Sequence, residues 1–205
     1  MRFEKLSIVT LTSALALLAV IAPLGAHGFS EEGWHAIIRW TARVSVTAFL
    51  LAFAARPLRQ VWASAASGWM LRNRRYLGVS FGVAHITHLA AIVGLAVQFP
   101  EPFRSETSAL TLVGGGFCYL MIALMLLTST DRTAAWLSRK NWRRLHTTGM
   151  YTIWGIFVQS YVGRVAVGDS EYASVSGALL GLAGLRLWIY LRGRSRARDS
   201  AATAN

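Results

Sequence analysis

Residues 82–98 read GVAHITHLAAIVGLAVQ, a mostly apolar stretch with His85 and His88 near its start. It belongs to a longer apolar run that covers residues 77–98. A membrane-spanning helix needs roughly 20 consecutive, mostly apolar residues, and residues three apart lie on the same face of a helix. Ionisable side chains inside such a helix are costly and mark functional positions. The stretch therefore predicts a membrane helix that carries two imidazoles on one face near the middle of the bilayer.

The rest of the chain repeats this apolar pattern. Of its 205 residues 54% are hydrophobic and only 15% are charged, which is too apolar for an ordinary soluble domain. Six runs are long enough to span a membrane: 6–25, 35–55, 77–98, 108–128, 147–167 and 173–191. The first run has features of a signal peptide, but it is as long as a full span. We therefore expect an all-α integral membrane protein, with a six-helix transmembrane domain over residues 1–191 and a polar, basic, disordered tail over residues 192–205.

The charged residues predict how this domain lies in the membrane. Sixteen of the 21 Lys and Arg residues lie before the first run, between the second and third, between the fourth and fifth, or after the sixth. The segments between the other runs hold six of the nine Asp and Glu residues. By the positive-inside rule both termini are cytoplasmic. This topology accounts for the net charge of +12 without nucleic acid as a partner, and the basic face can hold anionic membrane lipid.

Two interpretations of His85 and His88 are open. A histidine inside a membrane can hydrogen-bond to a carbonyl or hydroxyl group of a neighbouring helix. Neutral imidazole is also an axial ligand of haem iron, and a gap between helices can hold a macrocycle when small residues line it. Glycines recur on the predicted third, fourth and sixth helices, among them Gly78 and Gly82. The histidine pair favours ligation.

Three other polar residues are candidates for the same site. His146 follows Arg144 by two residues, near the cytoplasmic rim, so it lies about 15 Å in depth from His88 and cannot share a metal ion with it. Arg39 and Arg43 are four residues apart on the outer half of the second helix and share a face. They need negative partners, which are either haem propionates or neighbouring groups such as Glu31, Glu32 or a carbonyl.

Several short motifs, in order and at matching spacing, carry a resemblance to a known family. They are TAR at 41–43, RPL at 56–58, RRYLG at 74–78, the histidine at 88, LTST at 127–130 and WRRLH at 142–146. From about residue 40 to 161 the chain resembles the ferric-reductase-like transmembrane domain family. Within that family it is most similar to the MsrQ branch, the free-standing haem-binding subunits of bacterial methionine sulfoxide reductase systems.

This resemblance implies a six-helix protein of the bacterial inner membrane that holds one or two b-type haems. His88 matches a family haem ligand and His146 matches a second one. In the family, the histidine that corresponds to His88 pairs with a second histidine. That second histidine lies 13 residues after the one that corresponds to His146, and this chain has Gln159 at that position. Glutamine is a poor ligand of haem iron, which leaves three alternatives. The iron is five-coordinate, His85 or another group supplies the missing ligand, or the site no longer binds haem.

The resemblance implies an electron-transfer subunit rather than a self-sufficient enzyme. Its electrons would come from a separate donor, a quinol or a flavin reductase, with quinone or flavin supplied by that partner, and would pass to a periplasmic acceptor protein. The alternative is a membrane scaffold or assembly partner that has kept the helix bundle and binds no haem, for which Gln159 is the main support.

Overall fold

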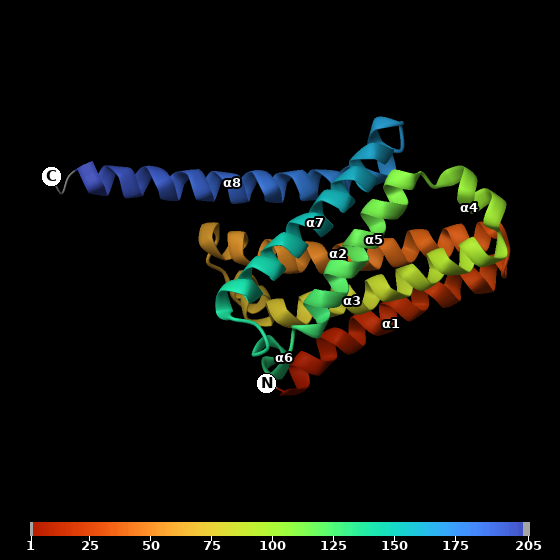
Figure 1. The fold of residues 1–205 in the computed structure, drawn as a ribbon, viewed down its shortest axis with the longest axis horizontal. Coiled ribbons are helices and arrows are strands. Elements are labelled where there is room, and N and C mark those ends of the chain that lie inside the picture. Colours follow the sequence, from red (N-terminus) through yellow and green to blue (C-terminus); the bar gives the residue numbers. More distant parts are fainter. Residues whose placement is uncertain (1, 203–205) are drawn as a thin grey trace.

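The computed structural model describes the backbone of residues 2–202 and the side chains of residues 7–195, and this part of the chain is all-α (Figure 1). Its helices are α1 (Arg2–His27), α2 (Glu31–Val61), α3 (Ala65–Gln98), α4 (Pro100–Glu106), α5 (Ala109–Leu127), α6 (Asp131–Ala134), α7 (Arg139–Ala166), the 3₁₀ helix η1 (Ser170–Tyr172) and α8 (Ala173–Ala202). The all-α fold predicted from the sequence is confirmed.

Five of these helices are long and apolar enough to cross a membrane: Ser7–His27, Glu31–Val61, Ala65–Gln98, Ala109–Leu127 and Ser170–Ser195. Large apolar side chains on these helices face outward, as lipid contact requires, including Leu17, Val93, Val113 and Leu187. The chain is therefore a multi-pass helical membrane protein. The run predicted at 147–167 forms α7, but α7 is not among the five, because polar residues such as Gln159 and Ser160 interrupt its apolar part.

Serine residues fix where four of the long helices begin. In each case the hydroxyl oxygen accepts a hydrogen bond from a backbone N–H three residues later, which satisfies one of the free amides of the first turn. These N-cap residues are Ser30, Ser64, Ser108 and Ser138. Gly28, with φ of 61°, makes the left-handed turn between α1 and α2 that other residues rarely adopt.

Two helices extend further at their basic ends than the apolar runs predicted. α2 continues to Val61 and α3 begins at Ala65, so the two are separated by only three residues. Arg74 and Arg75 therefore lie on α3 rather than in a loop. The polar segment after residue 191 also differs from expectation, because residues up to Ala202 continue α8 instead of being disordered. Residues 203–205 of that segment lie outside the described part of the chain.

Consecutive long helices run in opposite directions, with α1, α2 and α3 side by side and α5 and α7 crossing them obliquely (Figure 1). α7 packs against α5 and α8, and α8 also packs against α2. An aromatic cluster joins three of these helices: the Phe49 ring lies 5.5 Å from the Phe81 ring and 5.3 Å from the Phe157 ring, centroid to centroid. This cluster is the centre of the core and lies between the two candidate sites described below.

Glycines let α5 approach its neighbours. A Cβ atom added to Gly82 of α3 would lie 2.6 Å from Leu126 Cδ2 and 2.8 Å from Leu126 Cγ, and one added to Gly149 of α7 would collide with Met125. Both neighbours, Leu126 and Met125, lie on α5. The close contacts of α5 with α3 and α7 therefore depend on these two positions having no side chain.

Candidate functional site

His85 and His88 lie side by side in the core, with ring centroids 5.2 Å apart. Each imidazole contacts a hydroxyl group on α2 through its Nδ1 atom. His85 Nδ1 lies 3.1 Å from Ser45 Oγ, and His88 Nδ1 lies 3.1 Å from Thr41 Oγ1. The two hydroxyl-bearing residues are four apart on α2 and both are fully buried, so α2 and α3 meet along a short polar line inside an apolar core.

The hydrogen bonds of these hydroxyls determine the tautomer of both histidines. Thr41 donates its single hydrogen to the Ile37 carbonyl, at 2.7 Å, and Ser45 donates to the Ala42 carbonyl, at 3.0 Å. Each hydroxyl oxygen must therefore accept from the histidine, which places the proton on Nδ1. The Nε2 atom of each ring is left as a lone pair. A neutral imidazole with Nδ1–H held by a neighbour is the form that binds a metal through Nε2.

Aromatic rings enclose His85 more closely than His88. The Tyr119 ring of α5 stacks on His85 at 4.9 Å, and the rings of Phe81 and Phe157 lie 5.2 and 5.7 Å from it. The Tyr119 hydroxyl is buried and has no hydrogen-bond partner. His88 is only half-buried. His88 therefore has the more accessible imidazole of the pair.

The structure does not bring Gln159 to the histidine pair. The buried residues of α7 are four apart, Ile153, Phe157 and Tyr161, and Gln159 is exposed on a different face of the helix. The α7 side chain that contacts His85 is Phe157. The resemblance places Gln159 opposite His88, but in this structure Gln159 does not face the histidine pair.

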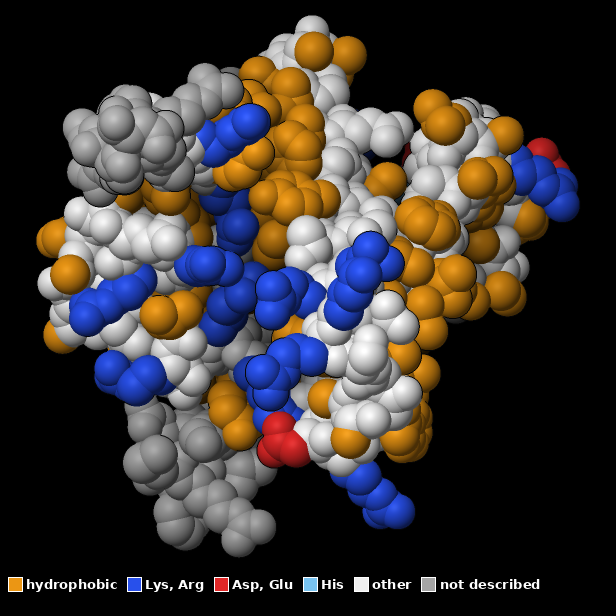
Figure 2. All heavy atoms as spheres, turned by 60° about the vertical axis from the view of Figure 1, so that its left-hand side comes forward, with side chains coloured by type: hydrophobic (Ala, Val, Ile, Leu, Met, Phe, Trp, Pro, Cys, Tyr) orange, Lys and Arg blue, Asp and Glu red, His pale blue; other side chains and the backbone are white. Residues whose placement is uncertain are grey.

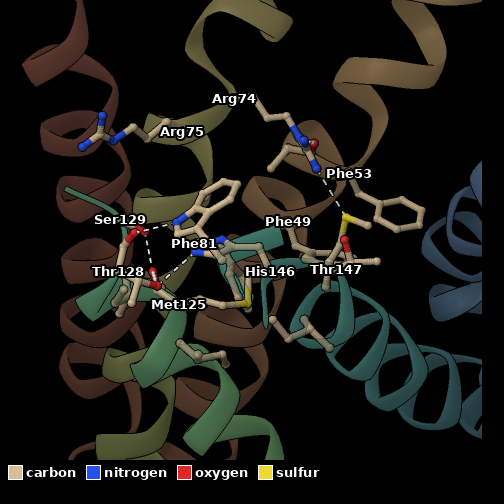
Figure 3. A pocket seen from close by; sticks show the side chains of 18 of the residues that line it. Phe49, Phe53, Arg74, Arg75, Phe81, Met125, Thr128, Ser129, His146 and Thr147 are labelled. Atoms are coloured by element: carbon tan, nitrogen blue, oxygen red, sulfur yellow. Dashed lines mark hydrogen bonds between the residues drawn. The ribbon is translucent and has the colours of Figure 1, made fainter. Parts of the chain in front are cut away.

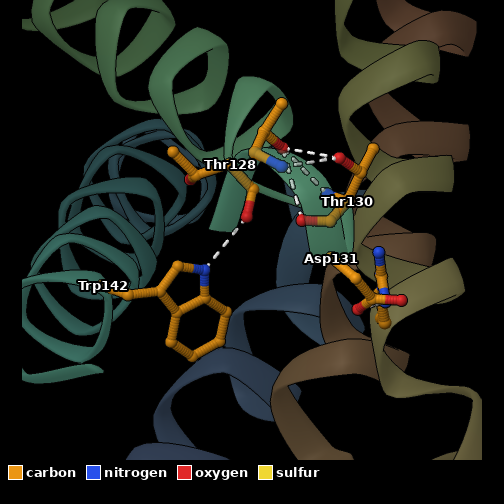
Figure 4. A network of polar contacts seen from close by, with 6 residues as sticks. Thr128, Thr130, Asp131 and Trp142 are labelled. Atoms are coloured by element: carbon orange, nitrogen blue, oxygen red, sulfur yellow. Dashed lines mark hydrogen bonds and ion pairs between the residues drawn. The ribbon is translucent and has the colours of Figure 1, made fainter. Parts of the chain in front are cut away.

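His146 lies apart from the pair, near the start of α7, and is held by α5. Its Nε2 atom lies 3.0 Å from Thr128 Oγ1, and Thr128 donates its hydrogen to the Leu124 carbonyl at 2.7 Å. His146 must therefore donate from Nε2, so that nitrogen has no lone pair for a metal. The Trp142 ring stacks on His146, with 4.1 Å between ring centroids. Trp142 Nε1 donates to the Thr128 carbonyl at 3.0 Å (Figure 4).

A cavity of about 750 Å³ opens beside His146 (Figure 3). Its inner walls are apolar and come from α2, α3 and α5, with Phe49, Phe81 and Ile122 among them. The inner end reaches Phe81, whose ring contacts His85, but neither His85 nor His88 lines the cavity. One aromatic layer therefore separates the cavity from the histidine pair.

Arginines line the outer part of this cavity. They are Arg56 of α2, Arg74 and Arg75 of α3, Arg143 of α7 and Arg186 of α8. Figure 2 shows the lysine and arginine side chains gathered on this end of the molecule, with few acidic side chains among them. Arg186 lies inside the last apolar run, and a charged residue within a predicted span was a sequence signal for this site. Arg186 was nevertheless not among the predicted site residues.

The two arginines on the outer half of α2 have different environments. Arg43 forms an ion pair with Glu171 of η1 and its guanidinium lies 4.8 Å from the centre of the Trp40 ring. Its negative partner is thus a residue of the protein, although not Glu31 or Glu32. Arg39 is exposed and lines an open hollow at the same end of the molecule.

The same hollow brings together a His and two Glu residues that the sequence analysis did not connect. His35 Nε2 lies 3.9 Å from a Glu31 carboxylate oxygen and 3.7 Å from a Glu106 carboxylate oxygen. One ligand atom from each residue lies within 4.8 Å of the others. Glu32, Arg39 and Arg164 line the hollow too, and Arg164 forms an ion pair with Asp169.

Comparison of the chain with protein-family models, with curated proteins and with solved structures finds no match.

Proposed function

We propose that this protein is a membrane electron-transfer subunit, similar to MsrQ, that holds one b-type haem at the histidine pair. One feature carries the proposal: in two neighbouring imidazoles, the buried His85 and the half-buried His88, Nδ1 lies 3.1 Å from a hydroxyl that already donates to a carbonyl, so Nε2 is assigned as the lone pair. The donor chemistry of the pair fits haem iron.

Haem, when bound, supplies a one-electron redox centre. The contribution of the chain is to position its ligand and exclude water. Thr41 fixes the ring orientation and tautomer of His88, and Ser45 does the same for His85. Because His88 is the less enclosed of the two, we assign it as the iron ligand and His85 as a neighbouring polar group. His146 is not assigned as a ligand of this haem, because it lies apart from the pair, at the cavity that neither His85 nor His88 lines.

The proposal includes the topology and partners that the resemblance implies. α7 is the sixth span of a protein in the bacterial inner membrane, and both termini are cytoplasmic. In support, the sixth helix gives an even number of crossings, and α7 packs on both sides against candidate spans, α5 and α8. Electrons arrive from a quinol or a separate flavin reductase and leave to a periplasmic acceptor protein.

A second candidate function is a membrane scaffold or assembly partner without haem. Two observations favour it. The rings of Tyr119 and Phe157 pack directly against His85, so a macrocycle there must displace them. Arg43, for which a haem propionate was one of two possible partners, already pairs with Glu171.

The absorption spectrum of the purified protein separates the two functions. Expressed with added haem precursor, the protein is expected to show b-type bands in the reduced-minus-oxidised spectrum. His88→Ala should lose most of the haem per protein and His85→Ala less, whereas the control His35→Ala, at the opposite hollow, should keep it. A colourless protein that is correctly inserted supports the scaffold. Loss of haem with His85→Ala but not with His88→Ala would reverse the assignment within the pair.

A further inference from the structure

The basic cavity holds far more positive than negative charge. Five arginines line it, and among its lining residues Asp131 is the single acid. Asp131 pairs with Arg75, with 2.7 Å between Nη1 and Oδ1. The remaining four arginines have no carboxylate partner among the residues that line the cavity. Of these four, Arg74 and Arg186 are partly buried, and charged groups taken out of water are costly when they lack a counter-charge, so the imbalance points to an anion that comes from outside the chain.

Arg74 and Arg186 are the two arginines whose contacts show this most clearly. Arg74 Nε donates to the Ala52 carbonyl at 3.2 Å, and Arg186 Nη2 donates to the Phe53 carbonyl at 2.5 Å. A second contact of each is with the same uncharged atom, the sulfur of Met150, at 3.4 and 3.8 Å. Arg186 Nε is buried and has no partner. The Arg186 guanidinium also lies 4.0 Å from the centre of the Phe53 ring. Two like charges therefore meet at uncharged groups, and the Arg186 Nε–H is free to donate.

The position of these arginines limits the kind of anion. The cavity walls beyond them are apolar and include Phe49, Ile122 and Leu126. Arg74 lies in the first third of α3 (Figure 3), and Arg186 reaches the Phe53 carbonyl in the last part of α2, so both are nearer the end of the molecule where α2 ends and α3 begins. The charge pattern of the sequence assigns this end to the cytoplasm, and anionic lipids are concentrated in the cytoplasmic leaflet. A ligand with an anionic head and an apolar body matches both parts of the cavity.

We propose that this cavity binds one anionic phospholipid of the cytoplasmic leaflet, with Arg74 and Arg186 donating to its phosphate and an acyl chain lying along the apolar walls. Guanidinium groups bind phosphate oxygens through strong, charge-assisted hydrogen bonds. This site is separate from the histidine pair and does not depend on haem. It shares with the proposed function only the orientation of the chain in the membrane.

Native mass spectrometry of the protein in mild detergent tests the proposal. The wild-type protein is titrated with phosphatidylglycerol and, separately, with phosphatidylcholine of the same acyl chains. We expect one phosphatidylglycerol molecule to bind roughly tenfold more tightly than phosphatidylcholine, because the choline ammonium group cancels the phosphate charge and is repelled by the arginines. The double variant Arg74→Gln with Arg186→Gln should lose this preference. The control Arg72→Gln with Arg144→Gln removes the same charge from exposed positions outside the cavity and should keep it.

Three results would overturn the proposal. Equal affinity of the wild-type protein for the two lipids would show that the cavity does not select an anionic lipid. An equal loss of the preference in the control variant would show that it comes from general surface charge. Displacement of the lipid by millimolar inorganic phosphate would show that the site takes a free anion. Because Arg74 and Arg186 also bind backbone carbonyls, Arg143→Gln at the exposed rim serves as a second variant, with a several-fold weaker preference expected. Haem content measured on the same samples reports on the histidine pair independently.

Discussion

At the scale of single residues, hydrogen bonds inside α2 determine the chemistry of the histidines on α3. Thr41 and Ser45 are held by carbonyls of their own helix, so each can only accept from an imidazole. Nothing about the stretch 82–98 itself distinguishes a ligating tautomer from any other. The same reasoning gives His146 the opposite tautomer, because Thr128 contacts its Nε2.

Removing these hydroxyls should leave a buried imidazole N–H without a partner. Thr41→Val and Ser45→Ala are each expected to lower the free energy of unfolding by about 1–3 kcal/mol, the usual cost of an unsatisfied buried polar group. Thr47→Val is the matched control, because Thr47 is exposed and its hydroxyl binds only the Arg43 carbonyl of its own helix. Denaturant unfolding in detergent measures all three. An equal cost for all three variants would show that the hydroxyls act within α2 alone.

At the scale of the helices, the position of α5 depends on which glycines face it. Gly78 and Gly82 are one turn apart on α3, yet a Cβ atom on Gly78 would meet nothing within 4 Å while one on Gly82 would lie 2.6 Å from the Leu126 side chain. Both residues appear equivalent in the sequence as small residues on a membrane helix. Only the packed structure shows that one of them is needed for contact.

This difference predicts opposite outcomes for the same substitution. Gly82→Ala should destabilise the protein by about 1–3 kcal/mol, the usual cost of overpacking, because Leu126 must move. Gly78→Ala should be neutral or slightly stabilising, since alanine costs a helix less backbone entropy than glycine. Thermal unfolding of the two variants side by side measures the difference. Equal melting temperatures would mean that α5 can shift without cost and that the close contact between Gly82 and Leu126 does not affect stability.

At the scale of the whole molecule, the two ends differ in charge and in the kind of site they carry. The arginine-lined cavity lies at one end, and the hollow with Glu31, His35 and Glu106 lies at the other. The aromatic cluster and the histidine pair lie between these two ends. This order fits a protein that crosses the membrane with its basic end in the cytoplasm.

Topology reporters test that orientation and the crossing of α7. Cysteines placed at Arg139 and Arg192 should react with an impermeant thiol reagent only from the cytoplasmic side, and cysteines at Glu101 and Asp169 only from the outside. The buried Cys118 should stay unreactive in intact membranes and serves as the internal background. If positions 139 and 169 react from the same side, α7 does not cross and the six-span topology fails.

The sequence by itself determined the elements. Apolar runs and the three-residue spacing of the histidines act over a few residues, so the all-α fold, five of the spans and the position of His85 and His88 on one face could be predicted. The low apolar content of α7 is also a local property, which is why its crossing stays a prediction.

The tertiary structure alone decided which side chains meet. The pairs Arg43 with Glu171, Arg186 with the Phe53 carbonyl and Thr41 with His88 join residues 128, 133 and 47 positions apart. No local pattern encodes such contacts, because they depend on how each helix is rotated about its axis when the bundle packs. That rotation turns Gln159 outward and Phe157 toward His85, and it gathers arginines from four helices around one cavity.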